Sequence, residues 1–226
     1  MTPGSESLVR APLFASLSAE DIRALDARCI WRKVKAGAWV IDDHADGTDV
    51  FFVIGGHARV VMAGSKHEII LRDILDGEYF GELSAVDGKP RSAGILAITD
   101  TNIAQMRAKM FREAIHQHPS VCDRVLAALA ASIRAVNDRV DEQVNFEARE
   151  RLILELLRLS RKTGNDRIAV SPPPTHAEFA ARIGTQREAV TKFLNALERL
   201  GTISRARGAI VLNDPERLRS LVSRAR

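Results

Sequence analysis

The most informative segment of the chain is GELSAVDGKPRSA, residues 81–93. It interrupts a series of short β-prone runs, and Gly81 to Ala85 are suited to start a short helical turn whose backbone N–H groups form an anion-binding nest. Arg91 and Ser92 follow, and their guanidinium fork and hydroxyl would complete a cradle for one phosphate. The same residue pairs also occur in purely structural turns, so the pattern alone leaves both interpretations open.

Glu82 needs its own explanation, because a carboxylate beside a bound phosphate is repulsive unless it has another role. Accepting a hydrogen bond from a sugar hydroxyl, while also pairing with Arg91, would be such a role. The segment therefore favours a ligand in which a sugar hydroxyl lies near the phosphate.

Six short β-prone runs surround this segment between Trp31 and Met106. Turn residues separate the runs about every ten residues, which favours a compact antiparallel barrel or sandwich. Gly55-Gly56 lies between two of them at hairpin distance. The runs are residues 39–41, 49–54, 58–62, 67–74, 94–98 and 101–106.

Segment 81–93 resembles the phosphate-binding cassette of the cyclic nucleotide-binding domain, as found in the cyclic AMP receptor protein/fumarate-nitrate regulator family of bacterial transcription regulators. The resemblance implies that Arg91 and Ser92 bind the cyclic phosphate and that Glu82 binds the ribose 2′-hydroxyl. This chain has one residue fewer between the two half-motifs than some relatives, which is a difference in loop length. The ligand-binding residues implied in the cassette are Gly81, Glu82, Leu83, Ser84, Arg91, Ser92 and Ala93.

The resemblance also implies an α+β architecture in three parts. Residues 1–110 would form an N-terminal antiparallel β-roll or jelly-roll domain that binds the nucleotide. Residues 111–145 would form a long dimerisation helix, and residues 146–226 a winged helix-turn-helix domain that binds DNA.

After Phe111 the apolar residues change from period two to period 3.5. They form an a/d seam of nearly three heptads, with β-branched Ile133 and Val140 at a positions, which suits a parallel two-stranded coil. The seam predicts a homodimer, and the alternative is an amphipathic helix packed on its own domain. The seam residues are Cys122, Leu126, Leu129, Ile133, Val136 and Val140.

Asn137 lies at the flank of this seam. In the family that the chain resembles, the helix supplies hydrogen-bonding side chains to the nucleotide base from two adjacent positions. Val136 occupies the first position and has neither donor nor acceptor, so Asn137 alone keeps this chemistry. The identity of the base therefore stays open, and Asn137 has setting the helix register as its alternative role.

Two capping-box patterns predict a helix-turn-helix in the C-terminal part. Thr175 begins THAE and Thr185 begins TQRE, and Ile183-Gly184 separates the two helices. The prolines at 172–174 exclude a helix immediately before the motif. The residues expected to pack the two helices together are Phe179, Ala180, Ile183, Val190 and Leu194.

The second helix, expected from Gln186 to Leu200, would enter the major groove of DNA. Arg187 is suited to guanine, Glu188 to cytosine and Lys192 to a second guanine. In the resembled family a second arginine stands at the Lys192 position of a helix that reads TGTGA-like half-sites, and lysine lacks its planar fork. Residues 202–212 alternate into a hairpin that resembles a wing. The predicted DNA contacts are Thr175, Gln186, Arg187, Glu188, Thr191, Lys192, Arg205 and Arg207.

The charge of the chain is unevenly distributed. The formal net charge is +4, but residues 1–145 carry 17 basic and 20 acidic side chains, whereas residues 146–226 carry 16 and 9. These counts correspond to −3 and +7, so the second part alone is expected to meet a polyanion. With 46% hydrophobic and 27% charged residues, the composition excludes extended disorder.

Several alternative chemistries are disfavoured by residue type. Cys29 and Cys122 are too few for the four ligands of an iron–sulfur cluster, and neither has metal-ligand spacing. Haem would need an axial histidine, for which His57 and His67 are available, although solvated strand histidines are the simpler interpretation. No apolar run is long enough to cross a bilayer or to act as a secretory signal. We therefore expect a cytoplasmic protein without a metal, haem or membrane partner.

These patterns together predict a homodimeric transcription regulator, not an enzyme, that binds cyclic AMP and then double-stranded DNA with a two-fold symmetric site. Cyclic GMP is the alternative ligand. A regulator of the same family that needs no nucleotide, or answers another small effector, is the alternative function. The loop at residues 161–166 is a candidate contact for RNA polymerase or a solvated loop.

Overall fold

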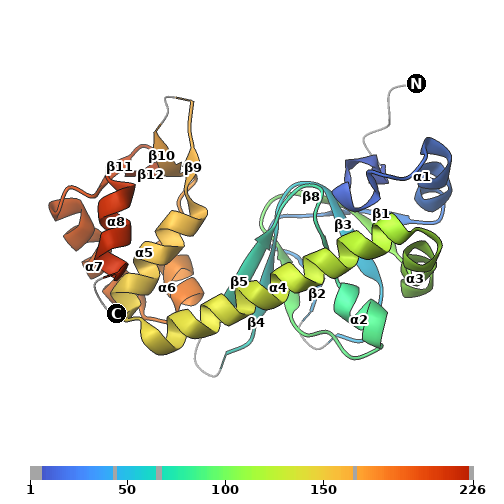
Figure 1. The fold of residues 1–226 in the computed structure, drawn as a ribbon, viewed down its shortest axis with the longest axis horizontal. Coiled ribbons are helices and arrows are strands. Elements are labelled where there is room, and N and C mark those ends of the chain that lie inside the picture. Colours follow the sequence, from blue (N-terminus) through green and yellow to red (C-terminus); the bar gives the residue numbers. More distant parts are fainter. Residues whose placement is uncertain (1–6, 43–44, 65–67, 165–166, 224–226) are drawn as a thin grey trace. The chain divides into compact units, whose positions relative to one another are not determined.

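The computed structural model describes residues 7–42, 45–64, 68–164 and 167–223. The chain divides into two compact units, residues 1–132 and 133–226. In the N-terminal unit the described strands form two antiparallel sheets with the orders β1-β8-β3-β6 and β2-β7-β4-β5 (Figure 1). The strands are β1 Ile30–Val34, β2 Trp39–Ile41, β3 Val50–Gly55, β4 Ala58–Met62, β5 Ile69–Ile74, β6 Tyr79–Phe80, β7 Gly94–Ala97 and β8 Thr101–Met106.

Strand β3 explains how one sheet serves two cores. Successive side chains of a strand point to opposite faces, and in β3 both faces are apolar. Phe51 and Val53 pack into a core shared by strands of both sheets. Phe52 and Ile54 pack on the opposite face, against a core that contains Phe111. The two sheets therefore enclose one core, while helices cover the outer face of the first sheet.

The helices of this unit were only partly predicted. The short turn starting after Gly81 is α2, Glu82–Asp87, as the sequence indicated. The others in the described residues are η1 Leu8–Arg10, η2 Pro12–Phe14, α1 Ala19–Asp26 and α3 Ala108–Gln117. All six predicted β-prone runs contain strands, with shifted ends in 49–54, 67–74 and 94–98, whereas β1 and β6 were missed.

The long helix is shorter than predicted. Helix α4 runs from Pro119 to Asn145, 27 residues, and residues 108–117 form the separate helix α3. The residue before a proline is pushed out of the helical region, and His118 is accordingly extended, with φ −125° and ψ 97°. Pro119 therefore ends one helix and starts the next, so the predicted helix over 111–145 is two helices.

The C-terminal unit contains a helix-turn-helix followed by a β-hairpin (Figure 1). Its sheet has the order β11-β12-β10-β9 and is antiparallel. The 161–166 segment begins with β9, and residues 165–166 lie outside the described residues. The elements are α5 Ala148–Leu159, β9 Arg161–Lys162, β10 Ile168–Val170, α6 His176–Ile183, α7 Arg187–Arg199, β11 Ile203–Ala206, β12 Ala209–Leu212 and α8 Pro215–Ser223.

One of the two predicted capping boxes is present. The Thr175 hydroxyl accepts from the backbone N–H of Glu178, whose carboxylate accepts from the Thr175 N–H. Helix α7, in contrast, begins at Arg187, and its N-cap is Gln186 without a side-chain hydrogen bond, so the box at Thr185 is wrong. The packing prediction is confirmed, because all five residues named for the helix-helix contact lie buried in one core.

The fold class is confirmed: an N-terminal domain of antiparallel sheets, a long helix and a C-terminal helix-turn-helix with a β-hairpin wing. Within the described residues, no helix is both long and apolar enough to cross a membrane.

Candidate effector and DNA-binding sites

The start of α2 is built around Gly81. This residue is the N-cap of α2 and adopts a left-handed conformation with φ 85°. A Cβ here would lie 2.7 Å from the carbonyl oxygen of Asp49 and 2.6 Å from Nη1 of Arg91, so a side chain would require rearrangement. The first N–H groups of a helix lack acceptors within it, and at the start of α2 that of Glu82 donates to its own carboxylate. The N–H groups that follow it are the ones that could serve an anion nest here.

Arg91 is held beside this turn by backbone groups. It is 6% exposed. Its Nη1 donates to the Gly81 carbonyl at 3.1 Å and its Nη2 to the Asp49 carbonyl at 2.8 Å. Its Cζ lies 5.6 Å from the centroid of the Phe51 ring, a cation–π distance. Burial lowers the pKa of Arg91 while the Asp49 and Glu82 carboxylates raise it, and the guanidinium stays charged.

Glu82 is a half-buried carboxyl at the first position of α2. Burial raises its pKa, against a hydrogen bond from its own backbone N–H and the charges of Arg72 and Arg91, which lower it. A hydrogen bond donated to a carboxylate stabilises its charged form. A ligand hydroxyl would therefore offset part of the cost of keeping Glu82 ionised in this position.

The remaining cassette residues have different surroundings. Ser84 is buried, and its Oγ donates to the Pro90 carbonyl at 3.4 Å, which connects α2 to the loop before Arg91. Ala93 is also buried, whereas Leu83 and Ser92 are exposed. The cassette thus places one buried guanidinium and one exposed hydroxyl at neighbouring positions, 91 and 92.

Two anchoring groups of this site were missed from sequence. The Asp49 carbonyl accepts from Arg91, and the Asp49 carboxylate accepts from Nε2 of Gln105 at 2.7 Å. On α3, Arg112 donates from Nη1 to the Ala85 carbonyl at 2.7 Å and so holds α2. The contacts of Arg91 with the Asp49 carbonyl and of Arg112 with the Ala85 carbonyl have main-chain acceptors, for which no side-chain pattern exists.

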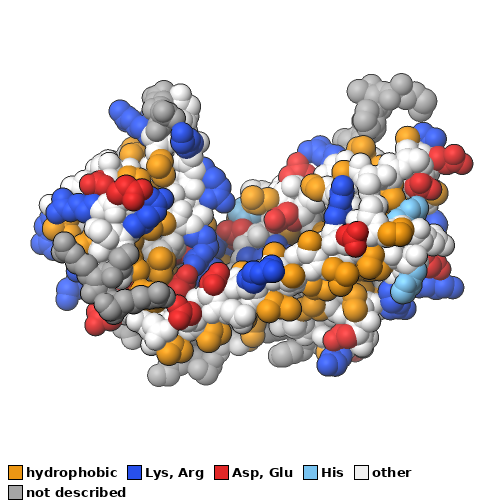
Figure 2. Space-filling model, in the orientation of Figure 1, with side chains coloured by type: hydrophobic (Ala, Val, Ile, Leu, Met, Phe, Trp, Pro, Cys, Tyr) orange, Lys and Arg blue, Asp and Glu red, His pale blue; other side chains and the backbone are white. Residues whose placement is uncertain are grey.

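Helix α4 has two apolar faces. Val121 and Val125 are buried in the core of the N-terminal unit, and Leu129 packs partly against it. Figure 2 shows hydrophobic side chains gathered along α4. Of the predicted seam, four residues are more than half exposed, and Val144 extends the same face. These exposed residues are Leu126, Ile133, Val136, Val140 and Val144. Asn137 is exposed on the same helix.

The predicted base-reading residues lie at the start of α7. Gln186, Arg187, Glu188 and Lys192 are all exposed. The opposite face of α7 is buried through Val190, Leu194 and Leu197. The polar face is therefore available to a partner, as a recognition helix requires.

Thr191 is held by a residue that was missed from sequence, His176. Thr191 Oγ1 donates to the Arg187 carbonyl at 3.1 Å, so its 2.7 Å contact with His176 Nδ1 makes that nitrogen the donor. Burial, then the charges of Arg205 and Arg187, lower the pKa of His176, which favours the neutral ring. Thr191 thus joins α7 to the start of α6.

The wing hairpin, β11 and β12, is attached to α7 through Arg205. Its Nη2 donates to Asn195 Oδ1 at 2.6 Å, and its Nε lies 3.6 Å from Glu198 Oε2. Arg205 therefore positions the wing in addition to its predicted phosphate contact. Arg207, beside the Gly208 turn, is exposed. Figure 2 shows Lys and Arg side chains over much of the visible face of the C-terminal unit.

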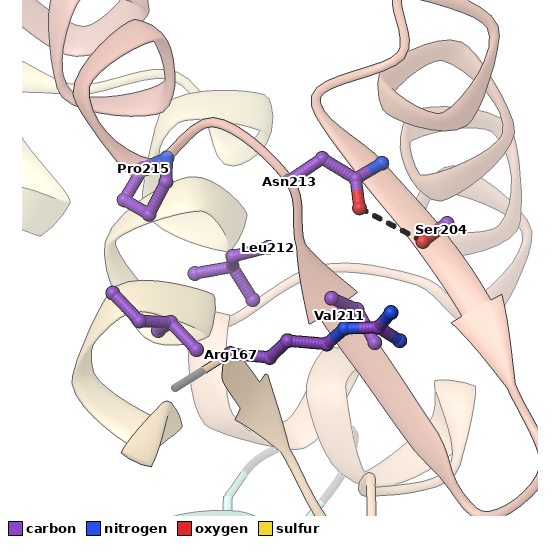
Figure 3. Close-up of a pocket in the computed structure, with 7 residues that line it drawn as sticks. Arg167, Ser204, Val211, Leu212, Asn213 and Pro215 are labelled. Carbon is purple, nitrogen blue, oxygen red and sulfur yellow. Dashed lines mark hydrogen bonds between the residues drawn. The ribbon is translucent and has the colours of Figure 1, made fainter. Parts of the chain in front are cut away.

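A hollow of ≈ 570 Å³ lies on the C-terminal sheet (Figure 3). Two of its polar side chains are paired with protein groups: Ser204 Oγ donates to Asn213 Oδ1 at 2.9 Å, and Asn213 Nδ2 donates to the Gly201 carbonyl at 3.1 Å. The predicted effector and DNA contacts are not among the lining residues. These are Arg167, Ile168, Ser204, Val211, Leu212, Asn213 and Pro215.

Metal-ligating residues do not gather in the described parts of the chain: no group of three His, Cys, Asp or Glu side chains could hold an ion there. His57, one of the two histidines considered for haem, has Nε2 3.5 Å from Asp73 Oδ1. His67, the other, lies outside the described residues.

Comparison with known proteins gives two domain matches. Residues 31–118 match the cyclic nucleotide-binding domain, and residues 150–221 match the Crp-like helix-turn-helix domain. The cyclic AMP receptor protein of Thermus thermophilus is 27% identical over 207 residues, which cover 90% of this chain and 93% of that protein.

Solved structures show the same fold. A CooA variant from Carboxydothermus hydrogenoformans has a TM-score of 0.81 at 21% identity, covering 94% of this chain and 95% of its own. The c-di-GMP responsive regulator CLP of Xanthomonas campestris has a TM-score of 0.72 at 16% identity, covering 86% and 99%.

Proposed function

Since the chain belongs to the cyclic AMP receptor protein/fumarate-nitrate regulator family of bacterial transcription regulators, we propose that it is a homodimeric DNA-binding regulator controlled by a cyclic nucleotide, with cyclic AMP as the effector. The nucleotide-binding part would lie within residues 1–110, the dimer helix within 111–145 and the DNA-binding part within 146–226. The two matched domains, residues 31–118 and 150–221, account for most of the given chain.

The arrangement of Arg91 carries the effector proposal. Its guanidinium is charged, buried and held by the Gly81 and Asp49 carbonyls beside the start of α2. A phosphate there would meet a preorganised cation, the first N–H groups of the helix and the exposed Ser92 hydroxyl. Glu82 would accept a ribose hydroxyl. No ordering of the arginine is required on binding, which favours affinity.

The choice of cyclic AMP is the finer part of the proposal. It is supported by the likeness to a protein named cyclic AMP receptor protein. A structural neighbour is described as c-di-GMP responsive, so this fold accommodates different effectors. Val136 provides no hydrogen bond to a base, and Asn137 is the residue on α4 that we propose for this contact.

The exposed face of α4 supports the dimer proposal. Leu126, Ile133 and Val140 repeat every seven residues and are more than half exposed. A continuous apolar stripe of this period is buried when a second α4 packs against it. Dimerisation would place two α7 helices on half-sites one DNA turn apart, about 34 Å. The nucleotide would act by binding the DNA-competent state more tightly than the other state.

A titration tests the proposed effector. A DNA site is first selected from a random-sequence library, and its dissociation constant is measured by fluorescence anisotropy at fixed salt, because salt alone changes DNA affinity. We expect cyclic AMP to tighten binding by about 5- to 150-fold, the usual size of allosteric coupling, and cyclic GMP to have a smaller effect. Tight DNA binding that no cyclic nucleotide changes would identify a nucleotide-independent regulator instead.

The recognition helix gives a second expectation. Arg187→Ala should cost roughly 1 to 3 kcal/mol at one base position of the selected site and relax the preference there, because a bidentate contact to guanine is lost. The matched control is Arg207→Ala, on the wing, which should weaken all sequences equally and reduce the salt dependence. If Arg187→Ala also weakened every sequence to the same extent, Arg187 would be a phosphate contact.

A further inference from the structure

Side chains of α4 and α5 cap the end of the first helix of the helix-turn-helix. The last carbonyls of a helix have no partners within it. At the end of α6, Arg139 Nη1 donates to the Arg182 carbonyl at 3.2 Å. Gln143 Nε2 and Arg151 Nε donate to the Ile183 carbonyl at 3.4 and 2.9 Å. Arg139 and Gln143 are four residues apart and therefore share one face of α4.

A buried carboxylate holds these groups in place. Glu155 on α5 is 1% exposed. It forms an ion pair with Arg158, and its Oε1 lies 3.4 Å from Arg182 Nη1. Its Oε2 lies 3.7 Å from Arg139 Nη2. Arg158 also pairs with Glu142 on α4. Three helices, α4, α5 and α6, thus contribute charges to one cluster.

This cluster restricts the relative orientation of the three helices. Apolar side chains tolerate small shifts, whereas a buried charge is satisfied only where its partners stand in hydrogen-bonding geometry. The capped carbonyls belong to Arg182 and Ile183, immediately before Gly184, and α7 begins three residues later at Arg187. The C-terminal end of α4 therefore fixes the turn that leads into the recognition helix.

We propose that Arg139, assisted by Gln143, is a positioning residue for DNA recognition: it fixes the helix-turn-helix on the end of α4, so that the dimer accepts half-sites at one spacing. This inference rests on the proposed dimeric function. It assigns to Arg139 the control of spacing, whereas base preference stays with α7. A regulator without this connection would tolerate several spacings, because each DNA-binding unit could turn independently.

The test measures spacing tolerance and half-site affinity separately. The dissociation constant is determined for the selected two-fold symmetric site, for the same site with one central base pair inserted, and for a single half-site. One inserted base pair moves the second half-site along and around the DNA axis, since one turn spans about 10 base pairs. The insertion penalty is the dissociation constant for the site with the inserted base pair divided by that for the selected site. For Arg139→Ala we expect this ratio to fall roughly three- to thirtyfold, with the affinity for the single half-site unchanged within about twofold.

Two variants make the result interpretable. Arg134→Ala removes an exposed arginine of α4 and should keep the wild-type spacing penalty. Gln143→Ala removes one cap without touching Glu155, and it should reduce the penalty in the same direction if Arg139→Ala fails to fold. The proposal would be overturned if the insertion penalty were unchanged in both Arg139→Ala and Gln143→Ala. It would also be overturned if Arg139→Ala weakened binding to the single half-site as much as binding to the full site, or if the Arg139→Ala dimer dissociated. A monomeric wild type would instead refute the dimer.

Discussion

Replacement of Arg91 by alanine is expected to weaken binding of the cyclic nucleotide by about a hundredfold or more, measured by isothermal titration calorimetry. The reason is the loss of charged hydrogen bonds to the phosphate, each contributing about 1.5 to 3 kcal/mol. The buried position of Arg91 strengthens this effect, because a charged hydrogen bond is stronger where little water surrounds it. Binding that survives the substitution undiminished would show that the nucleotide site lies elsewhere.

Arg91 also holds the Gly81 and Asp49 carbonyls, so its loss has a structural component. Two further variants separate the loss of phosphate contacts from the loss of local structure. Ser92→Ala removes an exposed hydroxyl and should reduce affinity by about 1 kcal/mol, roughly fivefold, without changing the unfolding temperature. Arg91→Lys retains the charge but not the planar fork, and it should lie between the wild type and Arg91→Ala in affinity. Equal binding by Ser92→Ala and the wild type would remove Ser92 from the site.

The local geometry of segment 81–93 was predictable because its requirements are local. A glycine with positive φ, a short helix and an arginine ten residues later are all encoded within 81–93. The anchoring of Arg91 was not, because half of it comes from the Asp49 carbonyl, 42 positions away in sequence. Any residue type supplies a main-chain carbonyl, so no motif marks this contact.

The C-terminal unit shows a similar division. The apolar period predicted the packing of α6 on α7, since burial follows from residue spacing. The Thr185 capping box failed, because the turn after Gly184 extends to Gln186 before α7 begins. The link between His176 and Thr191, and the cluster around Glu155, join residues from different helices. Such contacts depend on how helices are placed, which the local sequence does not encode.

The largest stability effect is expected at Glu155. Glu155→Ala should destabilise the C-terminal unit by about 3 to 5 kcal/mol, the usual cost of breaking a buried ion pair, because the substitution removes the carboxylate shared by Arg139, Arg158 and Arg182. Circular dichroism during urea unfolding would measure the loss. Both tryptophans, Trp31 and Trp39, lie in the N-terminal unit, so their fluorescence transition should move much less and serves as an internal reference.

A paired substitution distinguishes the charge from the packing. Replacing a buried ion pair by apolar residues of similar size is often neutral or stabilising, whereas removing one partner is costly. The double variant Glu155→Leu with Arg182→Leu should therefore recover most of the stability lost in Glu155→Ala. Arg139 and Arg158, with side chains 26% and 38% exposed, can turn toward solvent when the carboxylate is absent. A cost below about 1 kcal/mol for Glu155→Ala, in the range of exposed pairs, would mean that apolar packing alone holds α4, α5 and α6 together.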